Sequence, residues 1–289
     1  FGNHMDEENI EWKKASLFLE VDKVETKVRS ATAIDLKVTY TLPGVSTLYH
    51  SQYRFYGNGV ISMINTLEET KYKGDIPRIG MWMQLPYAFS EMTYFGRGPW
   101  ENYQDRNTSA FIDLYTSEVK DQYVPYIRPQ ENGYKTDVRW LALSNEFGDG
   151  LLVVSGNMKN SLGISALHMA NEDFDVTRGL DYSGKSKAEK KYRMRGEEIN
   201  KSKHTTDISE QDFVQLNIDM GQRGVGGDDS WWAKPQEEYL LMGSKRHGYS
   251  YWLIPYKQGN AELYFNLSKK YINSIILHGS RYNSKDYYR

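Results

Sequence analysis

Short segments in which apolar and polar residues alternate recur along the whole chain. The clearest cover residues 16–21, 33–40, 60–64, 137–143 and 213–219, and residues 151–154 form a short, wholly apolar run. An alternation with a period of two places the apolar side chains on one face of a β-strand. Turn-forming pairs such as Pro43-Gly44 and Asn58-Gly59 lie between these segments. Short strands at regular spacing predict an all-β fold, a large antiparallel β-sandwich.

The same patterns favour a single large domain. Residues 1–10 are predicted to be a leader, residues 11–256 the sandwich, and residues 257–289 a C-terminal extension with two further strands at 261–265 and 272–277. No stretch has a convincing helical periodicity over three turns. Residues 178–203 are rich in Lys, Arg, Glu, Gly and Ser, which indicates a long exposed loop; a basic patch for nucleic acid is the alternative.

Composition narrows the classes of function. The 289 residues carry a net charge of −2, so neither a nucleic-acid partner nor a membrane-surface partner is expected. The chain has no cysteine, which excludes disulfides, a thiolate nucleophile and a Cys-based zinc site within it. No apolar run approaches the ~20 residues of a membrane-spanning helix. We therefore expect a soluble protein, and both a cytoplasmic and a periplasmic location remain open.

The segment Gly224 to Trp232, here called the glycine loop, is the strongest functional candidate. It reads Gly-Val-Gly-Gly-Asp-Asp-Ser-Trp-Trp. Glycines allow backbone conformations that other residues resist, and Asp and Ser side chains can hold a turn. An indole at the exit could stack on the apolar face of a sugar ring. The alternatives are that the two tryptophans are core residues, or that Asp228 and Asp229 bind a metal ion, although a calcium loop would alternate its oxygen ligands.

Two further segments combine glycines with polar and aromatic residues. In residues 94–106, here called the motif segment, Glu101, Asp105 and Arg106 could contact a sugar, but a buried ion-pair network that fixes the loop is the favoured interpretation. In residues 129–133, Glu131 precedes an Asn-Gly turn and could be catalytic or could cap that turn. The six histidines show no metal-binding spacing.

These segments together resemble the C-terminal small-chain domain of the bacterial β-galactosidases of glycoside hydrolase family 2. The resemblance rests on three motifs in the family's order, Gly96-x-Gly98-Pro99-x-Glu101-Asn102-Tyr103-x-Asp105-Arg106, Tyr123-x-Pro125-Tyr126-x-x-Pro129-x-Glu131-Asn132-Gly133, and Leu216-Asn217-Ile218-Asp219 leading into the glycine loop. It covers most of residues 11–256, and the charged loop and the tail beyond Tyr256 depart from it.

The resemblance implies a large sandwich of the galactose-mutarotase type that closes the chain of a multidomain enzyme. It implies that Trp231 forms part of the galactoside-binding surface, and we expect Gly226, Gly227, Asp228, Asp229 and Ser230 to support it. The two catalytic glutamates and the magnesium and sodium ligands of the family lie in a separate barrel domain. We therefore expect no catalytic residue, metal or cofactor in this chain. Its expected partners are a galactoside and the barrel of the same protein, and the full-length enzyme could be a homo-oligomer.

Two other classes of function remain open. A stand-alone aldose 1-epimerase of the mutarotase type would need a histidine acid and a glutamate base that converge on the sugar. The candidate residues for that pair are His168 or His204 with Glu172 or Glu238. A non-catalytic carbohydrate-binding or assembly module is the third possibility.

Overall fold

The fold was analysed in a computed structural model of the chain. It describes residues 5–72, 74–157, 161–174, 204–229, 234–272 and 274. The charged loop predicted at 178–203, together with Ser230, Trp231 and Trp232 of the glycine loop, lies outside these residues. Within the described part, no helix is both long and apolar enough to cross a membrane.

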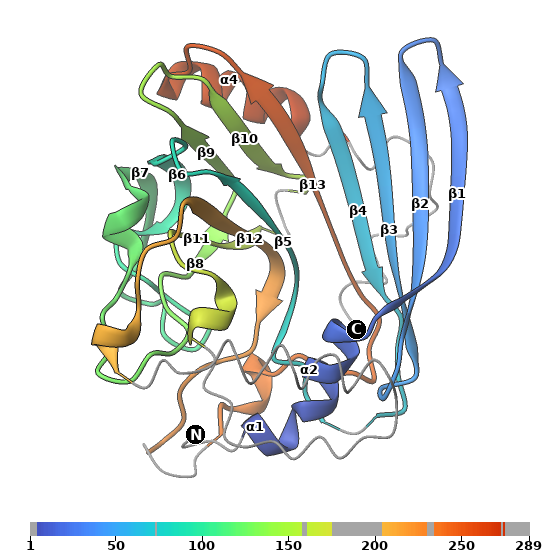
Figure 1. Cartoon of the computed structure of the whole chain (residues 1–289), viewed down its shortest axis with the longest axis vertical. Helices are drawn as coiled ribbons and strands as arrows, with labels where there is room; N and C mark the ends of the chain where they lie inside the picture. Colours follow the sequence, from blue (N-terminus) through green and yellow to red (C-terminus); the bar gives the residue numbers. More distant parts are fainter. Residues whose placement is uncertain are drawn as a thin grey trace.

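Among the described residues, thirteen strands form two antiparallel sheets (Figure 1). The large sheet has nine strands in the order β1-β2-β3-β4-β13-β10-β9-β6-β7. They are β1 (Glu20–Ser30), β2 (Ala33–Leu42), β3 (Thr47–Tyr56), β4 (Ile61–Leu67), β13 (His247–Tyr256), β10 (Gly150–Ser155), β9 (Trp140–Ser144), β6 (Glu91–Gly98) and β7 (Phe111–Glu118). The small sheet has the order β5-β12-β11-β8, with β5 (Arg78–Pro86), β12 (Phe213–Gln222), β11 (Leu162–Leu167) and β8 (Lys135–Val138).

The two sheets pack face to face, which confirms the predicted all-β sandwich. Leu141, Val153 and Tyr251 of the large sheet share one apolar cluster with Ile164 and Leu216 of the small sheet, and all five are buried. Side chains that alternate along each strand fill the space between the sheets. We call the side of the large sheet that faces the small sheet its inner face. The register between β10 and β13 places Leu152 and Val154 on the opposite, outer face.

A helix covers the outer face of the large sheet. Helix α4 (Ala261–Tyr271) begins at Asn260, whose Oδ1 accepts a hydrogen bond of 2.9 Å from the amide of Leu263. The Tyr271 ring lies 4.9 Å from that of Trp252, between centroids. The strand predicted at 261–265 is therefore wrong, because its apolar residues continue at the helical spacing through Leu267 and Tyr271. Most of the strand predicted at 272–277 lies outside the described residues.

The amino-terminal residues are also helical, in α1 (Met5–Glu8) and α2 (Ile10–Leu17). Trp12 and Ala15 of α2 are buried in the core between the sheets. The strand predicted at 16–21 is consequently wrong over its first residues, and β1 starts only at Glu20. In the stretch predicted as a leader, Asn9 is buried, and its Nδ2 donates a hydrogen bond of 2.8 Å to the Asp75 carbonyl. Four short 3-10 helices of the described part connect strands: η1 (Val119–Gln122), η2 (Asn171–Phe174), η3 (Thr205–Asp207) and η4 (Glu237–Tyr239).

Candidate functional site

The glycine loop begins where β12 ends, and its first residues are held by the motif segment. The amide of Gly226 donates a hydrogen bond of 2.7 Å to Oδ2 of Asp105. The amide of Gly224 donates one of 2.9 Å to the Tyr239 carbonyl. A Cβ atom at Gly224 would lie 2.8 Å from the Asp105 carboxylate and 2.9 Å from Cβ of Pro235. Only glycine fits this close approach of two chain segments.

The candidate residues that follow point toward solvent. Gly226, Gly227, Asp228 and Asp229 are all exposed, and the two aspartates lie in a bend. Trp231, the predicted sugar-binding residue, and Ser230 belong to the part of the chain that the structure leaves undescribed. Among the described residues, no group of three or more His, Cys, Asp or Glu side chains is placed to hold a metal ion. The described part of the loop is thus an exposed turn on an anchored base.

Glu101 is the centre of an ion-pair and hydrogen-bond network within the motif segment. Its Oε1 lies 2.5 Å from Nη2 of Arg106, and its Oε2 accepts a hydrogen bond of 2.8 Å from the amide of Gly133. The hydroxyl of Tyr126 donates to the same carboxylate. The Arg106 guanidinium in turn lies over the Tyr103 ring, 4.8 Å from its centroid. Both carboxylate oxygens of Glu101 thus have partners within the protein, in agreement with the interpretation of this segment as a structural network.

Asn102 fixes the turn that carries this network. Its Oδ1 accepts a hydrogen bond of 3.0 Å from the amide of Thr136, and its Nδ2 donates one of 3.2 Å to the Arg97 carbonyl. Asn102 is almost completely buried, as is the stacked pair of rings of Tyr103 and Tyr134, whose centroids are 5.6 Å apart. A buried amide that makes several hydrogen bonds holds a loop in one conformation. The motif segment is therefore a rigid support for Asp105.

A second ionic cluster joins the second and third motifs through Arg78, a residue that the sequence did not single out. Nε of Arg78, on β5, lies 2.6 Å from Oδ2 of Asp219, at the end of β12. Nη1 of the same arginine lies 3.4 Å from Oε2 of Glu131. Burial raises the pKa of Asp219 to about 7, against the opposing effect of the Arg78 cation. Glu131 is thus bound to a cation, and a lone arginine in a strand carries no sequence signal that would reveal this.

Lys135 is a buried cation next to the Glu101 network. Its side chain is 1% exposed, and its Nζ donates one long hydrogen bond of 3.4 Å to the Gly133 carbonyl. Burial lowers the pKa of Lys135 to about 8, although the charge of Glu101 acts in the other direction. An ammonium group has three donors, so this environment satisfies the charged form poorly.

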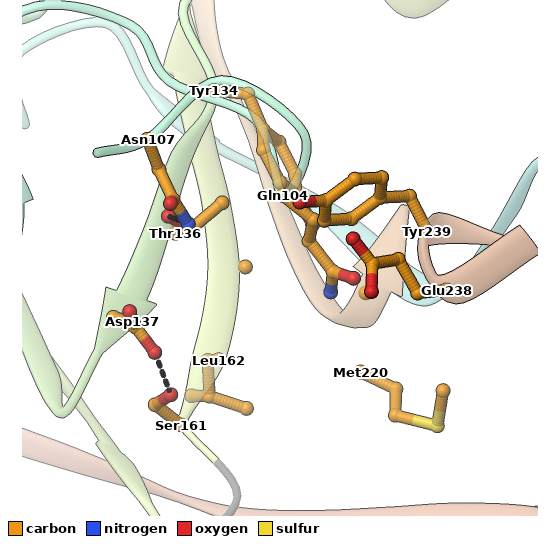
Figure 2. Close-up of a pocket in the computed structure, with 12 residues that line it drawn as sticks. Gln104, Asn107, Tyr134, Thr136, Asp137, Ser161, Leu162, Met220, Glu238 and Tyr239 are labelled. Atoms are coloured by element: carbon orange, nitrogen blue, oxygen red, sulfur yellow. Dashed lines mark hydrogen bonds between the residues drawn. The ribbon is translucent and has the colours of Figure 1, made fainter. Parts of the chain in front are cut away.

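A polar cavity of about 280 Å³ lies beside the base of the glycine loop. Figure 2 shows Gln104 of the motif segment with Glu238 and Tyr239 of the 3-10 helix η4 (Glu237–Tyr239) on one side. Asp137 and Ser161 lie on the other side, joined by a hydrogen bond of 2.9 Å. The cavity thus borders both the motif segment and the residues that follow the glycine loop.

The two histidines proposed for an epimerase, His168 and His204, contact other residues in the described structure. His168 is buried, its Nδ1 lies 3.0 Å from the Phe213 carbonyl, and its ring stacks on Tyr87 at 4.1 Å. His204 is exposed and lies 3.4 Å from the Asp207 carboxylate. Neither histidine forms a hydrogen bond or ion pair with Glu172 or Glu238 in the described structure.

Comparison with known proteins identifies the family. A family model described as "Beta galactosidase small chain" matches residues 2–253. A β-galactosidase of Priestia megaterium is 32% identical over 88% of this chain, and one of Vibrio cholerae is 30% identical over 72% of it. The chain spans only 22% and 18% of these two relatives. A galactose mutarotase related enzyme of Lactobacillus acidophilus superposes on 82% of the chain and 72% of its own, with a TM-score of 0.34 and 9% identity. On the family match and these relatives, the chain belongs to the β-galactosidase small-chain family.

Proposed function

We propose that this chain is the C-terminal domain of a larger β-galactosidase that hydrolyses terminal β-D-galactosides. The proposal is supported by the family match over residues 2–253 and by relatives that carry this activity in their names. Those relatives are about five times as long as the matched region, which leaves room for a separate catalytic domain. The partners of this domain are then the galactoside and the catalytic barrel of the same protein.

Within that enzyme, Trp231 supplies an aromatic wall of the galactoside site. The observation that carries this role is the hydrogen bond from Gly226 to Asp105, because it fixes the loop base only five positions ahead of Trp231. In this proposal Gly226, Gly227, Asp228, Asp229 and Ser230, which separate this anchor from Trp231 in the sequence, support the indole. A preorganised aromatic platform binds a sugar face without first losing loop entropy.

The catalytic carboxylates belong to the barrel in this proposal. A retaining glycosidase needs two carboxyl groups about 5 Å apart on either side of the glycosidic bond. The two glutamates of the motifs are poor candidates, because Glu101 is occupied by Arg106 and the Gly133 amide, and Glu131 faces Arg78. We therefore expect the isolated domain to have no hydrolase activity.

The test is the substitution Trp231→Ala in the full-length enzyme. Removing a stacking aromatic at a binding centre typically costs about 1–3 kcal/mol, so kcat/KM for a galactoside should fall by about 5- to 150-fold. Trp231→Phe should lower kcat/KM by a smaller factor, because a smaller ring still stacks on the sugar. The neighbouring Trp232→Ala is the matched control for general damage to the loop. Unchanged kinetics of Trp231→Ala would contradict the proposal.

The isolated chain provides an independent check. Incubated with an aryl β-galactoside, residues 1–289 should release no aglycone, and titration with galactose followed by tryptophan fluorescence would report whether the domain binds sugar without the barrel. Turnover by the purified chain would overturn the assignment of the catalytic groups to another domain.

A further inference from the structure

Strands β1 to β4 form one flank of the large sheet. One face of this flank is apolar, and the opposite face is polar and charged. In the register of these strands, Val24 lies opposite Val38, and Ile34 lies between Val28 and Phe55. Residues that are paired or separated by two positions share a face of the sheet. One face therefore carries Val21, Val24, Val28, Ile34, Leu36, Val38, Tyr53 and Phe55. The opposite face carries Glu25, Lys27, Asp35, Lys37, Gln52 and Arg54.

The apolar face of this flank continues the inner face of the sandwich. Met63 of β4 belongs to the core cluster between the sheets, and Tyr53 of β3 packs against it. Toward the edge of the sheet, however, the same face is open: Val24 is 57% exposed, Val28 72% and Ile34 48%. In antiparallel sheets, the apolar face normally packs on a core while the polar face meets water. Here the apolar face extends well beyond the part that the small sheet covers.

The small sheet ends on the side of the exposed apolar face of β1–β3. Its β8 edge lies against β6, since a Cβ at Gly96 would come within 2.9 Å of Val138. Its other edge is β5, which pairs with β12 and with no further strand among the described residues. β5 must therefore face the flank, as Figure 1 shows. Met81, Met83 and Leu85 of β5 are only partly buried against the core, as expected at an unfinished edge.

We propose that in the full-length protein strand-forming residues upstream of this chain extend the small sheet from the free edge of β5 and cover the apolar face of β1–β3. Facing sheets pack about 10 Å apart, so strands added to the edge of β5 would lie at packing distance from the apolar face of β1–β3. The occupant is a set of strands with alternating apolar residues. This inference concerns the architecture and does not rest on the proposed catalytic role.

Two observations point to upstream residues rather than to the tail. The first described residues lie at the start of β5, because Asn9, directly after α1, donates a hydrogen bond of 2.8 Å to the carbonyl of Asp75, three residues before that strand. The last helix, α4, packs instead on the outer face, where Tyr264 lies 5.8 Å from Trp140. The curated relatives are also long enough to contain such additional strands, since this chain spans only 22% of the Priestia megaterium enzyme.

Cysteine labelling in the full-length enzyme tests the proposal, because these 289 residues contain no cysteine. Val24→Cys and Ile34→Cys place thiols on the apolar face, and cysteine is a tolerated small apolar residue. Lys27→Cys and Lys37→Cys are the matched controls on the polar face of the same two strands. Mass spectrometry of the peptides that contain each position would give the rate of maleimide labelling.

We expect thiols at positions 24 and 34 to react at least about 100-fold more slowly than those at 27 and 37, because labelling would require local opening of the covering layer. Equal rates would overturn the proposal. Hydrogen exchange of the unsubstituted enzyme is a second measurement: the β5 amides that do not pair with β12 should exchange slowly, and fast exchange would count against an added strand.

A photo-crosslinker attached at position 24 would identify the occupant. The proposal requires crosslinked peptides that precede residue 1 of this chain. Crosslinks to residues 275–289, or to an isotope-labelled second copy in a mixed sample, would overturn it in favour of the tail or of a dimer interface.

Discussion

Oδ2 of Asp105 accepts a hydrogen bond of 2.7 Å from the amide of Gly226, although the two residues are 121 positions apart. The contact joins the first and last of the three sequence motifs at the base of the glycine loop. A charged acceptor strengthens such a bond, and the donor is a backbone amide that every substitution at Gly226 except proline would keep. The position of the loop therefore depends on the Asp105 side chain.

Replacing Asp105 with alanine should loosen the loop without unfolding the domain. A hydrogen bond to a charged group contributes about 1.5–3 kcal/mol, and part of this is returned because the exposed Gly226 amide can bind water. We expect Asp105→Ala to raise KM for a galactoside by several-fold in the full-length enzyme. Asp113→Ala is the control, since Asp113 is an exposed carboxylate that accepts only from the adjacent Leu114 amide. Equal kinetics of the two variants would show that the anchor is not needed.

Gly224→Ala should have a larger effect on stability. The added methyl group would lie within 3 Å of both Asp105 and Pro235. Such overpacking typically costs about 1–3 kcal/mol, so the thermal midpoint of the domain should fall. Gly221→Ala is a matched control, because its Cβ would meet only the mobile end of Gln104, at 3.1 Å. If both substitutions lower the midpoint equally, close packing at Gly224 is not the cause.

Arg78→Met should locally destabilise the pairing of β5 with β12. It would leave Asp219 buried without its cation, and breaking a buried ion pair costs about 3–5 kcal/mol. Hydrogen exchange of β5 and β12 amides should accelerate accordingly. Arg78→Lys should give an intermediate result, because a lysine cannot reach Asp219 and Glu131 in the same forked geometry. Arg29→Met removes an exposed ion pair with Asp35 and should change exchange little.

Lys135 should make the stability of the domain rise with pH. The pKa of Lys135 is lowered to about 8 in the folded chain, whereas an unfolded lysine titrates near 10.4. Above the folded pKa, the unfolded state binds more protons than the folded state, so the free energy of unfolding increases between about pH 8 and 10. Lys135→Met should stabilise the domain by about 1–3 kcal/mol at neutral pH.

The difference in stability between the unsubstituted domain and Lys135→Met isolates the contribution of Lys135, because the tyrosines titrate in both proteins. Urea midpoints measured at about pH 7 and about pH 9.5 should converge as the pH rises. A difference that stays constant over this range would show that the folded and unfolded states bind the same number of protons at Lys135, so that folding does not lower its pKa.

The alternation of side chains was sufficient to predict about half of the strands of the sandwich, and it did not reveal β3, β5, β7, β11 and β13. Residues 33–40 and 213–219 fall inside β2 and β12, and residues 151–154 lie in β10. Residues 137–143 span β8 and β9, with the break at Arg139. A period of two is a local property that burial on one face reinforces, so it survives in a single sequence.

The helices were missed because short amphipathic segments are ambiguous. Leu263 and Tyr264 follow a polar residue as they would in a strand, and only the later Leu267 and Tyr271 reveal the helical spacing. The Asn260 cap was the overlooked signal, since asparagine before a periodic segment favours a helix start.

For the candidate site, the sequence predicts the segments involved but not the contacts between them. The sequence identified the glycine loop and the ionic character of the motif segment, but the bond from Gly226 to Asp105 and the role of Arg78 depend on packing across the fold. Contacts between residues so far apart leave no periodic trace, and a lone strand arginine looks like any other surface charge.

The position of α4 has a practical consequence for recombinant production of this domain. The family match ends at residue 253, within β13, yet Trp140 and Trp252 on the outer face are covered by Tyr264 and Tyr271 of the helix. A truncation designed on the match would strip this cover and present two indoles to solvent, which favours aggregation. The usable carboxyl-terminal boundary therefore lies beyond Tyr271.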